Sequence, residues 1–350
     1  MSWWSDADDD DDDEFDESSI RTRPNPKGNR PRTKTRPEHK DALAGRIMTV
    51  DRGRFSVLID QDTPVEREIT ASRARELGRT HIVTGDWVDL VGDTSGEPGT
   101  LARVVRVHDR STLLRRSADD SDAVERVIVA NADQMLIVVA AANPEPRARL
   151  IDRYLVAAFD AGLKPILCIT KTDLADPAPL LTQFACLDLT VVTLSHDDVP
   201  LAALTDLLVG HTTVTVGHSG VGKSTLVNIL VPGADRATGV VNTVTGRGRH
   251  TSSSTLCLRL RAPDGRTGWI IDTPGVRSFG LGHVDPANIL KSFAATAFVP
   301  EGEPPGGIPL TEAHDWEIID RVEGGELGEC GKARIESLRK LIGTTADPLR

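Results

Sequence analysis

GHSGVGKS, residues 217–224, is the stretch that decides the fold of this 350-residue chain, because it has the GxxxxGKS pattern of a phosphate-binding loop. A strand-like run, TTVTV, precedes it, and a helical run, TLVNIL, follows it. The glycines let backbone N–H groups surround a phosphate at the positive end of that helix. Lys223 can reach the β- and γ-phosphates, and the Ser224 hydroxyl can ligate Mg²⁺. We therefore expect a nucleotide-binding loop made of Gly217, His218, Ser219, Gly220, Val221, Gly222, Lys223, Ser224 and Thr225.

Upstream of this loop, short apolar runs alternate with a helical pattern. The runs MLIVVAAA (135–142), KPILCIT (164–170) and LTVVTLS (189–195) have the length and composition of buried parallel strands. Between the first two lies an amphipathic helical pattern, residues 147–162, which ends in Gly162. This alternation predicts an α/β fold with a doubly wound sheet.

Downstream of the loop, the apolar run WIIDTPG (269–275) predicts a strand that ends in a second phosphate-linked motif. An acidic residue at Asp272 can hold Mg²⁺ through a water molecule. Gly275 can give its N–H to the γ-phosphate of the nucleotide. Both residues are therefore expected to act together with Ser224 at the phosphate end of the site.

The segment TKTD, residues 170–173, follows a predicted strand and can read the base of the nucleotide. The Asp173 carboxylate can accept hydrogen bonds from guanine N1–H and its 2-amino group, which adenine does not offer in that arrangement. Lys171 would lie along the base plane, and the loop at Ser195 suits a backbone N–H that meets guanine O6. Taken alone, TKTD is more often a surface Lys–Asp pair. Together the motifs favour GTP or GDP with Mg²⁺, and the base-reading residues would be Thr170, Lys171, Thr172, Asp173, Ser195 and His196.

The motifs occur in an unusual order. In ordinary GTPases the phosphate loop and the DxxG motif precede the segment that reads the base, whereas here that segment comes first. A circular permutation explains this order, because the same strands can occupy the same places in the sheet. The permutation also attaches the flanking domains beside DTPG, the segment that responds to the γ-phosphate.

A run of strand-like segments precedes the α/β region. Residues 45–60 alternate apolar and polar side chains and break at Arg52-Gly53, and further strand patterns follow up to residue 117. About five short strands in this length predict a β-barrel of the OB-fold type. Such barrels bind oligonucleotides, but Phe55 and Trp87 are the aromatic residues available for stacking. A purely structural barrel therefore remains an alternative.

Charge is distributed unevenly, although the formal net charge is −11. Residues 1–20 carry ten acidic residues and no Lys or Arg, whereas residues 21–40 carry eight basic residues and one acidic residue. We expect a disordered acidic and basic tail over residues 1–40. Its basic half either contacts RNA phosphates or is a solvated linker neutralised by the acidic run. The sequence contains no membrane-length apolar run, secretory signal or CxxC pair, so we expect a cytoplasmic protein with no membrane partner.

The permuted order TKTD…GHSGVGKST…GRGRHTSSST…DTPG, behind an OB-like barrel, resembles the ribosome small-subunit-dependent GTPase A family, also called RsgA or YjeQ. The strings NADQMLIVVAAA and IDRYLVAA also look like that family, and the resemblance covers roughly residues 41–280. It implies a late assembly or checkpoint factor that binds the 30S ribosomal subunit and its 16S rRNA, acts as a monomer, and hydrolyses GTP with stimulation by the ribosome.

The resemblance also assigns residues for hydrolysis. Many GTPases position the attacking water with a Gln just after DxxG, but here that residue is Val276, so intrinsic hydrolysis should be slow. The segment RGRHTSSST is the expected first switch, and by resemblance Thr251 reaches Mg²⁺ or the γ-phosphate, although Ser252 and Ser253 leave the register open. His250 is the family-matched candidate for the catalytic residue that positions water.

The C-terminal part departs from the family, which holds zinc there through a close Cys/Cys/His/Cys cluster. This chain retains His314 and Cys330 in that stretch, and two ligands do not complete a tetrahedral site. We predict a zinc-free helical domain with core positions at Trp316, Ile318, Ile319, Ile335, Leu338 and Leu341. The predicted domains are the tail (1–40), the barrel (41–116), the permuted GTPase domain (117–282) and the helical domain (283–350).

Three functions stay open at this point. The first is a GTPase that assembles on the small ribosomal subunit. The second is a GTP-dependent switch whose barrel recruits a protein partner, with no ribosomal role. The third is an ATP-dependent enzyme in which TKTD is accidental.

Overall fold

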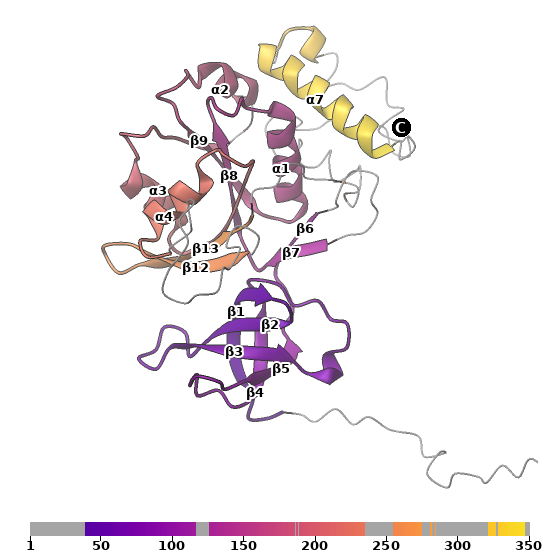
Figure 1. Ribbon diagram of the computed structural model, residues 1–350. Coiled ribbons are helices and arrows are strands. Elements are labelled where there is room, and N and C mark those ends of the chain that lie inside the picture. Colours follow the sequence, from indigo (N-terminus) through magenta and orange to yellow (C-terminus); the bar gives the residue numbers. More distant parts are fainter. Residues whose placement is uncertain are drawn as a thin grey trace, which may run out of the picture. The chain divides into compact units, whose positions relative to one another are not determined.

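The computed structural model describes residues 39–116, 126–185, 187, 189–234, 255–274, 281, 284, 321–326 and 328–346 (Figure 1). The chain divides into two units, Met1–Glu38 and His39–Arg350. The first unit, which holds nearly all of the predicted tail, lies outside the described residues. None of the helices in the described part of the chain is long and apolar enough to cross a membrane.

The first five strands close into a small barrel. Their bounds are β1 Leu43–Asp51, β2 Arg54–Ile59, β3 Arg67–Arg73, β4 Trp87–Gly92 and β5 Ala102–Val107. β1 pairs with both β2 and β4, and β3 pairs in parallel with β5, so the strands follow one another in the closed order β1-β2-β3-β5-β4. At the predicted turn between β1 and β2, Arg52 and Gly53 both have positive φ angles, 45° and 83°, as a tight hairpin requires. The short helix η2, Arg75–Leu77, lies between β3 and β4.

A two-stranded ribbon leads out of the barrel. It consists of β6, Leu113–Arg116, and β7, Arg126–Ala130, in antiparallel pairing. β6, which the sequence pattern grouped with the barrel, therefore pairs with β7 and not with a barrel strand.

The second half is a mainly parallel sheet in the order β10-β9-β8-β11-β13-β12. The strand bounds are β8 Gln134–Ala140, β9 Lys164–Thr170, β10 Thr190–Thr193, β11 Thr212–Gly217, β12 Leu256–Arg261 and β13 Thr267–Asp272. All neighbours pair in parallel except β12, which is antiparallel to β13. Since parallel strands carry their ligand sites at their carboxyl ends, the ends of β8, β9, β11 and β13 define the functional edge.

Helices cover both faces of this sheet. They are α1 Ala148–Asp160, α2 Ala178–Phe184, α3 Leu201–Leu208 and α4 Lys223–Leu230. Successive residues of a strand point to opposite faces, so Ile137 packs in a core with Tyr154 of α1, whereas Val138 packs in a core with Leu204 of α3 and Leu226 of α4. The doubly wound α/β sheet expected from the alternating pattern is therefore present.

The barrel joins the sheet through β1, which pairs with β12. The Arg46 guanidinium on β1 is 4% exposed and lies 4.6 Å from the centre of the Trp269 ring on β13. Burial lowers the pKa of Arg46 from its ordinary value. Arg259 on β12 lies 4.7 Å from the same ring and forms ion pairs with two acidic residues that follow β2, Asp62 and Glu66. One indole thus contacts a cation from each half of the structure.

The last described element is helix α7, Gly328–Ala346, which packs against α1 and α2 (Figure 1). Arg334 of α7 pairs with Asp152 of α1, and each side chain is only 2% exposed. The Arg334 guanidinium also lies 4.3 Å from the centre of the Phe184 ring. Ile335 is 5% exposed and joins the core, as predicted, while the other predicted core side chains of this region lie outside the described ones.

Cys330 forms a disulfide bond, which the scattered cysteines did not predict. Cys168 and Cys257 are buried free thiols.

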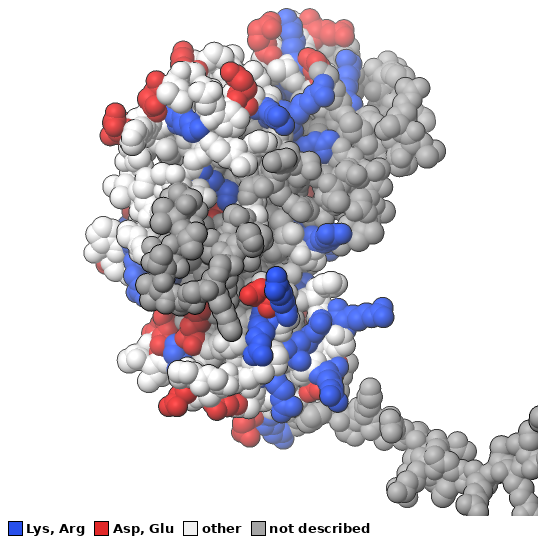
Figure 2. Space-filling view, viewed as in Figure 1, with Lys and Arg blue, Asp and Glu red and all other residues white. Residues whose placement is uncertain are grey.

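Figure 2 shows Lys and Arg side chains gathered along one side of the barrel, with Asp and Glu on the other side. Arg73 on β3 and Arg103 and Arg106 on β5 are exposed. The barrel therefore presents cations to the solvent on strands whose alternate residues point into its core.

Candidate nucleotide-binding site

The phosphate loop lies between the end of β11 and the start of α4, where the sequence places it. Gly220 and Gly222 have φ angles of 83° and 93°, which residues other than glycine rarely adopt. A Cβ atom on Gly217 would lie 2.5 Å from the carbonyl oxygen of Val138 on β8. The three glycines of the motif are therefore required, two by their φ angles and Gly217 by its close approach to β8.

Lys223 and Asp272, which are 49 residues apart, meet at the phosphate end of the site. Lys223 Nζ lies 2.5 Å from Asp272 Oδ1, and it also donates to the carbonyl oxygen of Thr273. Lys223 is 6% exposed and Asp272 is fully buried. One cation therefore lies beside the loop and one carboxylate lies at the end of the neighbouring strand. A site for phosphate and a metal ion needs both charges, and burial strengthens their electrostatic interactions.

The segment TKTD, which is predicted to read the base, is tied to the phosphate loop by two side chains. Thr170 Oγ1 lies 2.5 Å from the carbonyl oxygen of Val221. Lys171, whose φ of 57° is unusual for a residue with a side chain, donates from Nζ to the carbonyl oxygen of Gly220 at 2.8 Å and to that of Asn143. TKTD and GHSGVGKS are therefore parts of one site.

Asp173 and the loop at Ser195 also come together. Asp173 Oδ1 accepts a hydrogen bond from the His196 backbone N–H at 3.1 Å. The hydrogen bond positions the Asp173 carboxylate beside this loop, and the contact of a loop N–H with guanine O6 stays a prediction. Ser195 Oγ accepts a bond from the Asp198 N–H, which shapes the turn, and the Thr172 N–H donates to Leu194 at the end of the next strand.

The donors near the phosphate loop suit Mg²⁺. The Ser224 hydroxyl at the start of α4 and the Asp272 carboxylate at the end of β13 are hard oxygen ligands, which this ion prefers. Within the described residues there is no group of three or more His, Cys, Asp or Glu that could hold a metal ion by protein ligands alone. This donor set therefore fits an ion that shares its coordination with phosphate oxygens and water.

Three predicted site residues, His250, Thr251 and Gly275, lie outside the described residues, as does His314. Two residues of the site were not among the predicted ones: Thr215, whose hydroxyl bonds to Asp272, and Asn143, whose carbonyl oxygen holds Lys171. A signal for Thr215 was present, because TTVTV places threonines at alternate positions of an otherwise apolar strand.

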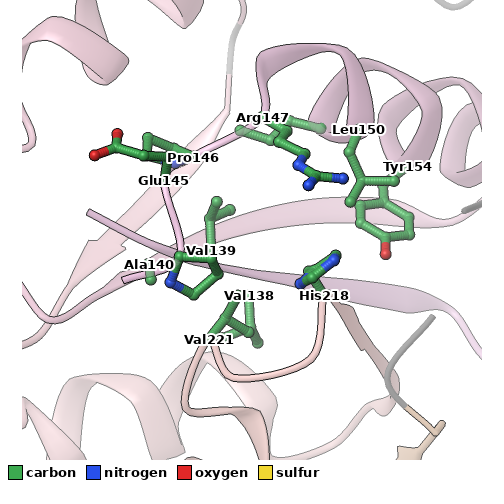
Figure 3. Close-up of a pocket in the computed structure, with 12 residues that line it drawn as sticks. Val138, Val139, Ala140, Glu145, Pro146, Arg147, Leu150, Tyr154, His218 and Val221 are labelled. Atoms are coloured by element: carbon green, nitrogen blue, oxygen red, sulfur yellow. The ribbon is translucent and has the colours of Figure 1, made fainter. Parts of the chain in front are cut away.

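A hollow of about 350 Å³, including space open to solvent, lies beside the phosphate loop between β8 and the start of α1. Figure 3 shows His218 of the loop opposite Arg147, which precedes α1, and Tyr154 of α1. Val138, Val139 and Val221 also line the hollow. His218 Nδ1 lies 2.8 Å from the carbonyl oxygen of Ser219, so the imidazole is held by its own loop.

Comparison with known proteins identifies the family. The family model described as RsgA GTPase matches residues 107–282, half of the chain. The small ribosomal subunit biogenesis GTPase RsgA of Pseudomonas aeruginosa strain LESB58 is 39% identical over 219 residues, which cover 61% of each chain. RsgA of Pseudomonas syringae pv. tomato is 38% identical over 246 residues, 65% of this chain and 68% of that protein. The chain thus spans about 61% of the length of the first of these relatives.

Two solved structures share the fold. YjeQ from Thermotoga maritima superposes with a TM-score of 0.63 at 23% identity, covering 87% of this chain and 99% of that one. YloQ, described as a circularly permuted GTPase, gives 0.62 at 20% identity, with coverage of 89% and 98%. The predicted fold class, a circularly permuted GTPase domain behind an OB-type barrel, is confirmed. This chain belongs to the RsgA GTPase family.

Proposed function

We propose that this protein is a cytoplasmic GTPase that binds the small (30S) ribosomal subunit and hydrolyses GTP to GDP and phosphate during late 30S maturation. The observation that carries the proposal is the continuity of the site. Lys223 and Asp272 lie at its phosphate end, and the hydrogen bond from Lys171 to Gly220 ties its base end to the same loop. A single nucleotide therefore spans both groups of residues.

Each end of the site has a defined task. At the base end, Asp173 accepts the N1–H and 2-amino hydrogens of guanine. At the phosphate end, the loop N–H groups and Lys223 hold the β- and γ-phosphates, while Ser224, Thr251 and, through water, Asp272 hold Mg²⁺. Mg²⁺, when bound, neutralises charge that develops on the transferred phosphate. Gly275 gives its N–H to the γ-phosphate.

His250 is the proposed catalytic residue. Replacing His250 with alanine is expected to leave GTP affinity nearly unchanged and to reduce ribosome-stimulated turnover by about 10²- to 10⁴-fold, because a group that positions water acts in the transition state. Phosphate release is measured with and without 30S subunits. His211→Ala, at the opposite end of β11 and paired with Asp133, is the matched control. Stimulated turnover at the wild-type rate in the His250 variant would exclude His250 from the mechanism.

The 30S partnership rests on the relatives and on the charge of the barrel. The relatives at 38–39% identity are named small ribosomal subunit biogenesis GTPases. Exposed arginines along the barrel, with the basic stretch before it, suit phosphate contacts with 16S rRNA (Figure 2). We propose that the protein binds the 30S subunit as a monomer, through the barrel formed by β1 to β5.

Cosedimentation tests this partnership. With a non-hydrolysable GTP analogue the protein should pellet with 30S subunits, and with GDP it should pellet less. Binding should weaken steeply as salt rises, since phosphate contacts release counterions. Guanine-nucleotide binding without any 30S association would favour a switch that recruits a protein instead. Equal competition by ATP and GTP for the nucleotide site would refute the guanine assignment.

We also propose that the C-terminal helical domain holds no zinc. Cys330, one of its two remaining family-type ligands, is disulfide-bonded, and a disulfide sulfur does not supply the thiolate that zinc binds. Helix packing through Arg334 and Ile335 supplies the attachment instead. Stoichiometric zinc in the purified, reduced protein would contradict this.

A further inference from the structure

Thr215 on β11 and Asp272 on β13 are register partners in neighbouring parallel strands. Register partners point to the same face of a sheet, so the two side chains lie next to each other. Thr215 is fully buried, and so is Asp272. A hydroxyl in such a place costs free energy unless it is hydrogen-bonded, and valine would fill the same volume.

The Thr215 hydroxyl has a partner that matters for the site. Thr215 Oγ1 donates to Asp272 Oδ1 at 2.8 Å. The carbonyl oxygen of the same residue accepts the hydroxyl of Thr273 at 2.6 Å and its N–H at 3.4 Å. One residue of β11 therefore holds the first two residues of the DTPG motif, one through its side chain and one through its backbone.

Asp272 Oδ1 is shared between Thr215 and Lys223, whose ammonium lies 2.5 Å away. Lys223 belongs to the phosphate loop, so a bound nucleotide draws its charge toward the phosphates. The Thr215 hydroxyl is on a central strand between β8 and β13, and its hydrogen bond to Asp272 joins β11 to β13 without the phosphate loop. This hydrogen bond does not depend on the ammonium, so Asp272 Oδ1 would stay hydrogen-bonded if Lys223 turned to a nucleotide.

We propose that Thr215 is a positioning residue for Mg²⁺: its hydroxyl fixes the orientation of the Asp272 carboxylate on which the metal site depends. This rests on the proposed nucleotide and Mg²⁺ site. Groups that orient a metal-binding carboxylate by hydrogen bonding change metal affinity by about 10- to 100-fold when removed. The role is distinct from packing, because the methyl group of Thr215 would remain in valine.

The strand provides a matched control. Thr213 is also fully buried, lies on the same face two residues earlier, and donates its hydroxyl to Gln134 Oε1 at 3.1 Å. Gln134 is at the amino end of β8, away from the phosphate loop. Thr213→Val thus removes a buried hydroxyl from the same strand without touching the site.

The test measures Mg²⁺ dependence in the binding of fluorescent GDP. Thr215→Val should raise the Mg²⁺ concentration for half-maximal slowing of GDP release by about tenfold, with GDP affinity in EDTA unchanged. Thr213→Val should leave the Mg²⁺ midpoint unchanged, and Thr215→Ser should restore it. An unchanged midpoint in Thr215→Val, or equal shifts in both valine variants, overturns the proposal.

Two further arms keep the result readable. If Thr215→Val does not fold, Thr215→Ser and Thr215→Cys carry the same comparison, because they differ mainly in the strength of the donor; equal midpoints for these two overturn the proposal. If the wild-type protein binds GDP without any response to Mg²⁺, the proposed nucleotide and Mg²⁺ site itself is wrong. This outcome differs from a failure of the Thr215 role alone, in which the wild-type protein responds to Mg²⁺ and Thr215→Val responds equally.

Discussion

Replacing Asp173 with asparagine is expected to lower the affinity for GDP by about 100-fold or more and to create affinity for xanthosine diphosphate. The bond from the 2-amino group is lost, and the bond from N1–H loses its charged acceptor. Since a hydrogen bond to a charged group contributes roughly 1.5–3 kcal/mol, the two changes together amount to a factor of roughly 10² to 10⁴. The amide nitrogen of asparagine opposes the 2-amino group of guanine as a second donor. The 2-oxo group of xanthine accepts a bond from that same nitrogen.

The fold should survive this change. The asparagine oxygen can still accept the N–H of His196, which holds the Asp173 side chain at 3.1 Å in the structure. Competition titrations with GDP, ADP and xanthosine diphosphate measure the shift in preference. Asp197→Asn removes an exposed charge from the neighbouring loop and should leave all three affinities unchanged. An Asp173→Asn protein that keeps its preference for GDP would show that this carboxylate does not read the base.

Replacing Arg334 with methionine is expected to destabilise the attachment of α7 by about 3–5 kcal/mol. The change leaves the Asp152 carboxylate buried without its cation, and a broken buried ion pair costs that much. The Ser337 hydroxyl still donates to Asp152, but it carries no charge. Urea unfolding measures the total loss, and hydrogen exchange of the α7 amides shows whether the helix detaches before the rest unfolds.

Two variants make the result specific. Lys332→Met removes a cation from the same helix whose partner, Glu329, is exposed, and it should cost less than about 1 kcal/mol. The double variant Asp152→Leu with Arg334→Met should recover most of the loss, because an apolar pair replaces a buried ion pair at little cost. Equal losses of stability for Lys332→Met and Arg334→Met would show that the buried Arg334–Asp152 ion pair does not attach α7.

The sequence was sufficient for the parts of the site that depend on local chemistry. The phosphate loop could be predicted because its glycines indicate backbone with positive φ angles. Gly220 and Gly222 adopt such angles in the structure. The strands of the sheet follow from apolar runs that are too short for helices. The five barrel strands follow from alternation, but their closed order depends on pairings between β3 and β5 and between β1 and β4 that no local pattern encodes.

Other features depend on contacts across long sequence separations. The bond between Thr215 and Asp272 joins residues 57 positions apart, and the threonines of TTVTV do not reveal which residue accepts each hydroxyl. Arg334 and Ile335 are neighbours on α7, yet only the apolar one was predicted to be buried, because arginine is rarely buried without a partner. The partner of Arg334 is Asp152, which lies 182 residues earlier in a helix predicted from amphipathic spacing.

The shared indole at the junction has a consequence for dissecting the protein. Trp269 is 7% exposed and is covered by Arg46 from the barrel. Excising the barrel would uncover this ring and remove Thr49, the β1 residue that pairs with Leu256 of β12. Conversely, a barrel expressed alone would uncover the Arg46 guanidinium, which is 4% exposed in the intact chain. Studies of isolated fragments would therefore report on surfaces that are buried in the intact chain.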